Sequence, residues 1–292
     1  MLDFRIETFL SVCRCKSYTA AARELNITQP AVSQHIRHLE GVYEVKLFDY
    51  QNKRLTLTPA GKELERAATT LRHDALYLKE RLQDIKAGTR SLIFGATRTI
   101  GDFDLSEKLI GYIKSMPNVT IRLHLDNTAA LLDQLNRGEI DFALVEGYFT
   151  KSEYSYRMYQ SVPFFAVSAR SSHQKPCALE DLFSKTLIVR EKGSGSREIL
   201  EQYLKENNAS IGDFQNILEI NSVHIIKKLV LAGCGITFLY QTAAKDELEK
   251  KMLFPIPIRQ MNVTHDFALV WRKGSIYQEE YLMQFDALFH GV

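Results

Sequence analysis

The chain has 292 residues, of which 45% are hydrophobic, and a formal net charge of +2; this length suits two or three compact domains with buried cores. No apolar run approaches the roughly eighteen residues that a membrane helix needs, and no apolar signal region opens the chain, which argues against a membrane protein and against export. Residues 1–90 hold 15 Lys and Arg against 11 Asp and Glu, whereas the remainder holds 22 against 24. A basic N-terminal part and a slightly acidic remainder indicate one module that binds nucleic acid and another that does not.

The cysteines and histidines show no pattern typical of a disulfide framework or a metal site. The four cysteines are Cys13, Cys15, Cys177 and Cys234. Because their spacing matches neither, free thiols in a reducing cytoplasm are expected. His35 and His38 have no third ligand nearby in the sequence, so we expect no metal and no bound cofactor.

A helical hairpin is predicted over residues 18–40, behind a first helix over residues 4–15. Asn26 can adopt the left-handed conformation that ends one helix, and Thr28 can cap the next. Pro30 then falls in a first helical turn, where its missing N–H costs nothing. Apolar side chains at helical spacing form the inner faces of both helices: Tyr18, Ala21, Ala22, Leu25, Val32, Ile36 and Leu39.

The outer face of the second helix carries Gln29, Ser33, Gln34 and Arg37. An amide, a hydroxyl and a guanidinium on an exposed helix are the groups that read base edges in a major groove. The same pattern also fits an ordinary helical hairpin with a solvated face, so the residues alone leave both interpretations open.

Two short strands are predicted next, near residues 47–50 and 54–58. The turn between them, residues 51–53, can lie over a minor groove. Lys53 and Arg54 would then be natural contacts to phosphates or to that groove.

A long helix is predicted from Pro59, capped by Thr58 and ended by Gly88. Its apolar residues recur in alternating steps of four and three: Leu64, Ala68, Leu71, Ala75, Leu78, Leu82 and Ile85. A strict heptad seam favours pairing with a second copy over packing on the helix's own domain. Two recognition helices would then face successive major grooves of an imperfectly palindromic site.

From Ser91 onward strands and helices alternate, which predicts parallel-rich sheets with helices on both faces. The predicted strands are 91–96, 120–125, 141–146, one or two over 156–169, 187–190, 216–221, 235–240 and 266–271, and the predicted helices are 102–115, 128–137, 196–207, 222–232, one from 242, and a last one to about 289. The short first half would be completed by the final strand and helix, so the chain is expected to cross to a second half and return.

Four strand ends carry polar donors and precede a predicted helix: 96–101, 126–128, 193–197 and 221–222. Open α/β sheets bind ligands outside the carboxyl ends of their strands, and helix N-termini there favour an anion. Arg98 or Arg197 could add a charge-assisted pair, whereas Glu146 at the same rim could bind an amine of the ligand or repel an anion. One such Ser or Thr would be an ordinary helix cap, but four converging strand ends favour a ligand site.

Residues 1–58 resemble the winged helix-turn-helix of LysR-type transcriptional regulators. The matching positions are Phe9, Leu10, 17–22, Leu25, 28–33, Ile36, Leu39, Glu40, Leu47, Phe48, Leu57, Thr58 and Gly61. Two positions depart from the family pattern, because Glu44 stands where a helix-ending Gly is usual and Tyr50 where Arg is usual. The later element order resembles the effector domain of the same family, and residues 189–197 are similar to a run in members that control sulfur assimilation or carbon fixation.

The resemblance implies an α/β protein with a helix-rich N-terminal domain. Its expected parts are a winged helix-turn-helix (1–58), a linker and dimerisation helix (59–90), and a periplasmic-binding-protein-like effector domain (91–292) with subdomains 91–162 plus 266–292 and 163–265. It implies a cytoplasmic transcriptional regulator that binds a two-fold operator or promoter and responds to a small anionic metabolite. The expected partners are double-stranded DNA, the effector, further copies in a homodimer or tetramer, and RNA polymerase, with no membrane.

The site residues implied by the resemblance and by the exposed faces fall into three groups. They are Thr28, Gln29, Pro30, Ser33, Gln34, Arg37, Lys53 and Arg54 for DNA; Thr97, Arg98, Thr99, Thr128, Ser196 and Ser222 for the effector; and Leu64, Leu71, Leu78 and Leu82 for dimerisation. No catalytic residue is expected, because residues 193–197 fit neither a nucleophile elbow nor a phosphate loop. The alternatives are a solute-binding protein of the same effector fold and a regulator that acts without a ligand.

Overall fold

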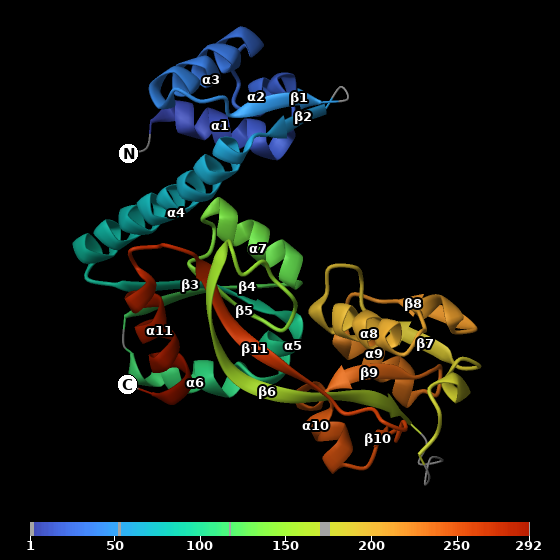
Figure 1. Cartoon of the computed structure of the whole chain (residues 1–292). Helices are drawn as coiled ribbons and strands as arrows, with labels where there is room; N and C mark the ends of the chain where they lie inside the picture. The colour runs from blue at the N-terminus through green and yellow to red at the C-terminus, as the bar shows by residue number, and fades with distance from the viewer. Residues whose placement is uncertain (1–2, 52–53, 117, 170–175, 292) are drawn as a thin grey trace.

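The computed structural model describes residues 3–51, 54–116, 118–169 and 176–291. A small N-terminal module sits at one end of a long helix, and a larger α/β part with two lobes lies along and beyond the other end (Figure 1). Within the described residues no helix is both long and apolar enough to cross a membrane.

The N-terminal module is a three-helix bundle with a small two-stranded wing. Its elements are α1 (Phe4–Cys15), α2 (Tyr18–Glu24), α3 (Gln29–Tyr43), β1 (Phe48–Gln51) and β2 (Arg54–Leu57). The predicted cap of α3 is present, because Thr28 Oγ1 accepts the Ala31 N–H at 3.3 Å, and Asn26 adopts a positive φ of 54°. Val32, Ile36 and other inner-face residues are buried in one core.

The two departures from the family pattern are both accommodated on the surface. Glu44 ends α3 in the left-handed conformation, with a φ of 55°, as the usual Gly would. A non-Gly residue there costs on the order of 1 kcal/mol. Tyr50 lies exposed on the wing strand β1.

The long helix α4 (Pro59–Ala87) begins and ends at the predicted residues. Thr58 Oγ1 accepts the Gly61 N–H at 2.9 Å, and Gly88 closes the helix with a φ of 65°. Gly61 also lets the wing approach closely, because a Cβ there would lie 2.1 Å from the Leu47 carbonyl oxygen.

The α/β part contains a seven-stranded mixed sheet whose main path runs β10-β6-β11-β5-β3-β4, with β9 also paired to β6. The strands are β3 (Arg90–Thr97), β4 (Val119–Asp126), β5 (Phe142–Val145), β6 (Tyr154–Ser168), β9 (Thr237–Tyr240), β10 (Phe254–Pro255) and β11 (Val263–Arg272). β3 is parallel to β4 and β5, whereas β6 and β11 are antiparallel to their neighbours. The long strands β6 and β11 run from one lobe to the other (Figure 1), as the predicted double crossing requires.

The lobe beside α4, termed the first lobe, contains β3, β4 and β5, and helices cover its sheet (Figure 1). In the second lobe, helices surround the small parallel pair β7 (Thr186–Val189) and β8 (Asn216–Glu219). The remaining elements are α5 (Arg98–Phe103), α6 (Ser106–Ser115), α7 (Thr128–Arg137), η1 (Glu180–Leu182), α8 (Gly195–Glu206), η2 (Ile211–Asp213), α9 (Val223–Leu231), α10 (Gln241–Glu249) and α11 (Gln278–His290). The prediction of a single helix over 102–115 is wrong, because two helices, α5 and α6, occupy this region. The chain turns at Asp104 between α5 and α6, which buries Leu105 completely in the main core.

Candidate DNA-binding surface and effector cleft

Among the described residues, the polar side chains on the outer face of α3 make hydrogen bonds only within the helix. Gln34 and Arg37 are exposed, and with Thr28, Pro30 and His38 they line an open surface hollow. Ser33 is tied to its neighbours, because Gln29 Nε2 donates to Ser33 Oγ at 3.0 Å and Arg37 Nε donates to the Ser33 carbonyl at 3.3 Å. The helix therefore presents amides, a hydroxyl and a guanidinium at one surface, as base reading requires.

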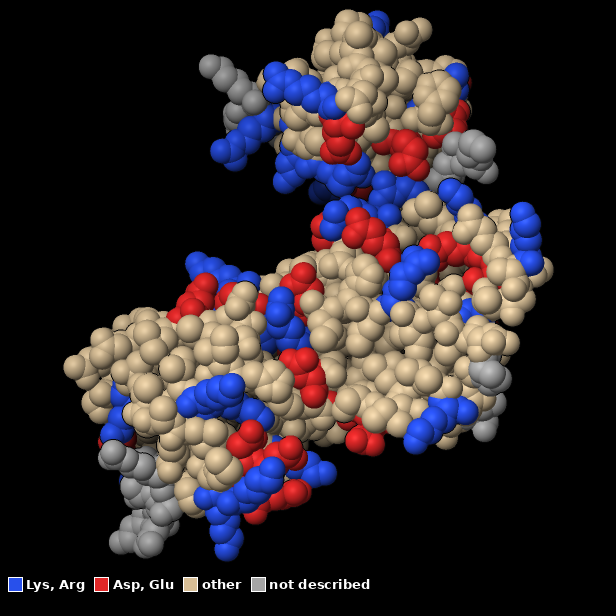
Figure 2. Space-filling model, turned by 180° about the vertical axis from the view of Figure 1, so that it is seen from behind, with Lys and Arg blue, Asp and Glu red and all other residues tan. Residues whose placement is uncertain are grey.

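The wing adds a second part to this surface. Arg54 is exposed on β2, whereas Lys53, the other predicted contact, lies outside the described residues. Figure 2 shows Lys and Arg side chains on the N-terminal module and at the junction between this module and the α/β part. The hollow on α3 also includes His38, which was not among the predicted DNA contacts.

The heptad residues of α4 divide into two groups. Leu64 and Ala68 pack into the core of the N-terminal module. The later ones, apart from the half-buried Ala75, are exposed on the helix surface: Leu71 is 57% exposed, Leu78 45%, Leu82 58% and Ile85 73%. An apolar stripe of this kind on a water-facing helix indicates a contact surface.

The opposite face of α4 is fixed to the first lobe by buried polar contacts. Asp74 accepts hydrogen bonds from Ser275 Oγ at 2.6 Å and from the Ile276 N–H at 3.0 Å. Thr70 Oγ1 donates to the Lys273 carbonyl at 3.1 Å, and the Tyr77 hydroxyl donates to Glu280 at 3.0 Å. Burial raises the pKa of Tyr77, and the Glu280 carboxylate adds to the shift. The helix and this lobe thus form a closely bonded unit.

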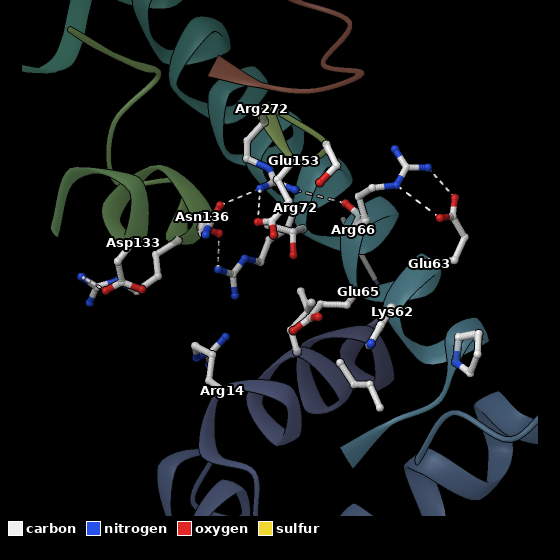
Figure 3. A pocket seen from close by; sticks show the side chains of 16 residues that line it. Arg14, Lys62, Glu63, Glu65, Arg66, Arg72, Asp133, Asn136, Glu153 and Arg272 are labelled. Carbon is white, nitrogen blue, oxygen red and sulfur yellow. Dashed lines mark hydrogen bonds and ion pairs between the residues drawn. The ribbon is translucent and has the colours of Figure 1, made fainter. Parts of the chain in front are cut away.

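A cavity of about 590 Å³ opens between the N-terminal module, α4 and α7 (Figure 3). Its charged lining is Arg14, Lys62, Glu63, Glu65, Arg66, Arg72, Asp133, Arg137, Glu153 and Arg272. Arg72 reaches across it, with Nη2 2.9 Å from the Asn136 carbonyl and Nη1 3.4 Å from Glu7 on α1. Arg272, which is 2% exposed, donates to Asn136 Oδ1 at 2.7 Å. No sequence signal pointed to this cavity, because its walls lie far apart in the chain.

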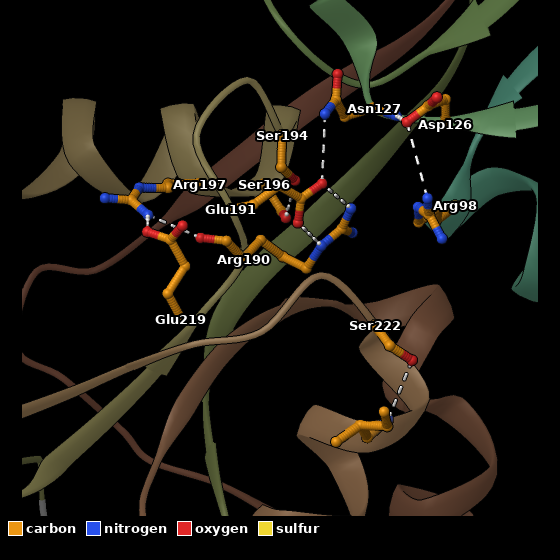
Figure 4. A network of polar contacts seen from close by, with 11 residues as sticks. Arg98, Asp126, Asn127, Arg190, Glu191, Ser194, Ser196, Arg197, Glu219 and Ser222 are labelled. Carbon is orange, nitrogen blue, oxygen red and sulfur yellow. Dashed lines mark hydrogen bonds and ion pairs between the residues drawn. The ribbon is translucent and has the colours of Figure 1, made fainter. Parts of the chain in front are cut away.

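The predicted effector residues do not all meet. Thr97, Thr99, Thr128 and Ser196 are buried at the seam between the lobes. Ser222 instead caps α9, where its Oγ accepts the Ile225 N–H at 3.4 Å, and it lies apart from Ser196 (Figure 4).

The two lobes touch at the seam through two glycines, Gly147 and Gly195, which leave no room for a side chain. A Cβ on Gly195 would lie 2.6 Å from the Gly147 nitrogen, and a Cβ on Gly147 would lie 2.6 Å from Thr128 Oγ1. The start of α8 therefore touches the end of β5 directly. Thr128, on α7, is held against the same point, so three separate segments converge there.

Glu146 is the acid at the centre of this seam, and it is 1% exposed. Thr97 donates its hydroxyl to the Glu146 carboxylate. Burial raises the pKa of Glu146 to about 7, opposed by the Arg190 charge and by a hydrogen bond from Thr99. Glu191 and Glu198 repel the carboxylate further. Burial and the neighbouring acids thus disfavour the charged form of this side chain.

The arginines near the seam are already paired with carboxylates (Figure 4). Arg190, which the sequence analysis missed, donates twice to Glu191, at 2.8 and 2.9 Å. Arg98 lies 3.8 Å from Asp126. Arg197 points away from the seam and pairs with Glu201 and Glu219, so it is not the free ligand partner that its glycine-rich loop suggested. Its pairing depends on β8, a strand more than fifteen residues further along.

A helical module with an exposed reading face, joined by a helix to a two-lobed α/β domain with a polar seam, defines a DNA-binding protein with a ligand-binding domain. Residues 5–62 match the family "Bacterial regulatory helix-turn-helix protein, lysR family", and residues 87–279 match "LysR substrate binding domain". The chain therefore belongs to the LysR family of transcriptional regulators. It is a DNA-binding regulator with an effector-binding domain and not an enzyme.

Known proteins with related sequences and folds agree. The chain is 27% identical to a probable RuBisCO transcriptional regulator of Trieres chinensis, over 87% of this chain and 85% of that protein. It is also 27% identical to the HTH-type transcriptional regulator CysL of Bacillus subtilis, over 83% and 82%. The regulatory domain of Synechocystis PCC6803 CcmR, solved in complex with 2-PG, superposes with a TM-score of 0.62 at 19% identity, covering 69% of this chain and 97% of that one.

Proposed function

We propose that the protein recognises a two-fold operator as a homodimer, with two dimers forming a tetramer, and that a small anionic metabolite between the effector subdomains alters its arrangement on DNA. The units are those of the sequence analysis: 1–58, 59–90, and 91–292 with subdomains 91–162 plus 266–292 and 163–265. Because its target is DNA, it acts in the cytoplasm, and RNA polymerase is a further partner there.

The exposed apolar stripe on α4 is the observation that supports a homodimer. Leu71, Leu78 and Leu82 face water on one side of a helix whose other side is bonded to the first lobe. A second copy of the same stripe would cover all three. The resulting two-fold symmetry would set two α3 helices on successive major grooves.

A gel shift with DNA from beside the protein's own gene tests recognition. Gln34→Ala or Ser33→Ala should weaken specific binding by roughly 1–3 kcal/mol and relax base preference, because each would lose a contact to a base edge. Lys53→Ala should instead weaken all sequences alike and reduce the salt slope by about one unit. Equal losses on specific and random DNA for the α3 variants would show that they contact only phosphates.

Two buried donors support the effector site. Among the described residues, Thr128 Oγ1 and Arg190 Nη1 are buried without a hydrogen-bond partner, and buried polar groups normally have one. Thr97, Arg98, Thr99 and Ser196 lie at the same seam, while Ser222 would be reached only by a larger ligand. The structural relative CcmR was solved with 2-PG, which supports a small-molecule ligand here.

Calorimetry with a panel of small acidic metabolites, followed by gel shift with and without each ligand found, tests this part. A ligand that favours one arrangement of the lobes must bind that arrangement more tightly. Should no ligand in the panel change operator binding or DNA bending, the alternative of a regulator that acts without an effector gains support.

A further inference from the structure

The charges at the effector seam do not balance. Arg190 is neutralised by Glu191 and Arg98 by Asp126. Among the described residues no Lys, Arg or His lies within ion-pair distance of the Glu146 carboxylate. The charge of Arg190 acts on it only from beyond that distance, and the hydroxyls of Thr97 and Thr99 hold it. A buried carboxylate without a counterion is costly, so the seam lacks one positive charge.

Other groups facing Glu146 do not supply that charge. Tyr240 donates its hydroxyl to the Glu146 carbonyl at 3.3 Å, and not to the carboxylate. His265 on β11 bonds the Glu146 backbone, and burial lowers the pKa of this histidine, which favours its neutral form. Tyr159 on β6 is buried and its pKa is raised well above the usual value, while Glu198 on α8 is a second acid.

Donors suited to a carboxylate lie one residue further along. Thr128 Oγ1 has no hydrogen-bond partner in the part of the chain that the structure describes, and it lies against Gly147, which directly follows Glu146. The Ala129 N–H, in the first turn of α7, makes only a 3.5 Å contact to the Gly193 carbonyl. A hydroxyl and an N–H at a helix N-terminus together form an acceptor site for a carboxylate.

We propose that the effector is an α-amino acid or a closely similar zwitterion, whose ammonium group pairs with Glu146 and whose carboxylate binds Thr128 and the N-terminus of α7. This inference rests on the proposed function of the seam as the effector site, and it names a zwitterion in place of the simple anion proposed there. The ligand separates Gly147 from Gly195 and supplies the missing counterion. Glu146 is thereby the residue that distinguishes an amine from the corresponding hydroxyl compound.

The test uses the full-length protein and three ligand sets: the twenty standard α-amino acids, the 2-hydroxy acid counterpart of each one that binds, and acidic metabolites without an amine. Thermal shift and calorimetry are run on the wild type, Glu146→Gln, and the control Glu139→Gln, whose exposed carboxylate pairs with Arg137 on the far side of the first lobe. We expect at least one amino acid to bind the wild type and the control at least tenfold tighter than its hydroxy acid. Glu146→Gln should remove that preference while still folding, because its amide oxygen can accept the Thr97 hydrogen bond.

An amino-acid effector paired with Glu146 is excluded by any of three results. These are that none of the amino acids binds, that the hydroxy acid binds as tightly as its amino acid, or that Glu146→Gln still prefers the amino acid. The acidic metabolites without an amine show whether only the amino-acid ligand is wrong or whether the seam does not bind effectors at all. If an acid without an amine binds and Thr99→Val weakens it, the seam remains the effector site and only the zwitterion is wrong. If no ligand of any set binds, both the zwitterion and the effector site fail.

Discussion

Two clefts among the described residues, one beneath the N-terminal module and one between the effector lobes, differ in how they use charge. The cleft beneath the N-terminal module is an open cavity of about 590 Å³ lined by six cations and four carboxylates. The seam between the effector lobes is closed by direct contact of Gly147 with Gly195 and encloses buried hydroxyls and one buried acid. Water-exposed ion pairs are worth roughly 0–1 kcal/mol each and rearrange cheaply, whereas buried polar groups must each find a partner. The first cleft therefore suits a movable joint, and the second suits selective binding.

The helix α4 connects these two clefts. One face of it is bonded to the first lobe through Thr70, Asp74 and Tyr77, and its N-terminal part forms a wall of the open cavity. Movement of the second lobe at the seam would be transmitted to the DNA-binding module through the first lobe and α4. The comparison thus predicts that changes at α4, the seam and the cavity have effects of decreasing size.

The largest effect is expected from breaking the exposed stripe of α4. Leu71→Glu combined with Leu78→Glu would place like charges across a buried seam between two copies, where unpaired charges are costly. Light scattering should show monomers, and operator affinity should collapse because one reading helix binds alone. A double variant that stays dimeric would place the interface on another surface.

The next largest effect concerns the buried acid of the closed cleft. The folded pKa of Glu146 is raised to about 7 from an ordinary value of 4.5, so its ionisation destabilises the fold as pH rises between these values. Glu146→Gln cannot ionise, and without ligand it should gain roughly 2–3 kcal/mol over the wild type between pH 5 and pH 8. Urea unfolding at both pH values measures the gain. If the stability difference between Glu146→Gln and the wild type does not change with pH, the pKa of Glu146 is not raised in the folded protein.

A smaller effect is expected from the hydroxyls around that acid. Thr99→Val and Ser196→Ala should each lower effector affinity about tenfold, because a buried ligand oxygen left unpaired costs about 1–3 kcal/mol. DNA binding without effector should not change, since neither residue lies in the N-terminal module. Calorimetry with the best ligand measures the loss, and unchanged affinity in both variants would remove the seam as the binding site.

The smallest effect is expected in the open cavity. Arg72→Ala removes one hydrogen bond to the Asn136 carbonyl and a 3.4 Å pair with Glu7, whose side chain is 41% exposed. Stability should fall by about 1 kcal/mol or less, and the change should shrink at high salt. Denaturant unfolding at low and high salt gives the comparison. A loss several times larger would mean that the cavity is a fixed interface and not a joint.

Sequence alone determined the features that depend on neighbouring residues. Thr28 and Thr58 cap their helices within three residues, and Gly88 ends α4 as expected. Most strands and helices fall within two or three residues of their predicted bounds, because apolar periodicity and caps act over a single turn or strand. The α3 face and the α4 stripe could likewise be read from spacing, since one helix carries each of them.

Only the tertiary structure decided which charges meet. Arg197 pairs with Glu219, 22 residues along the chain, and Thr97 meets Glu146 49 residues away. Arg272 reaches the Arg66 carbonyl across 206 residues. The physical reason is that a charge takes its partner and its burial from whichever segments fold against it, and neither is encoded within a few residues of the charge itself.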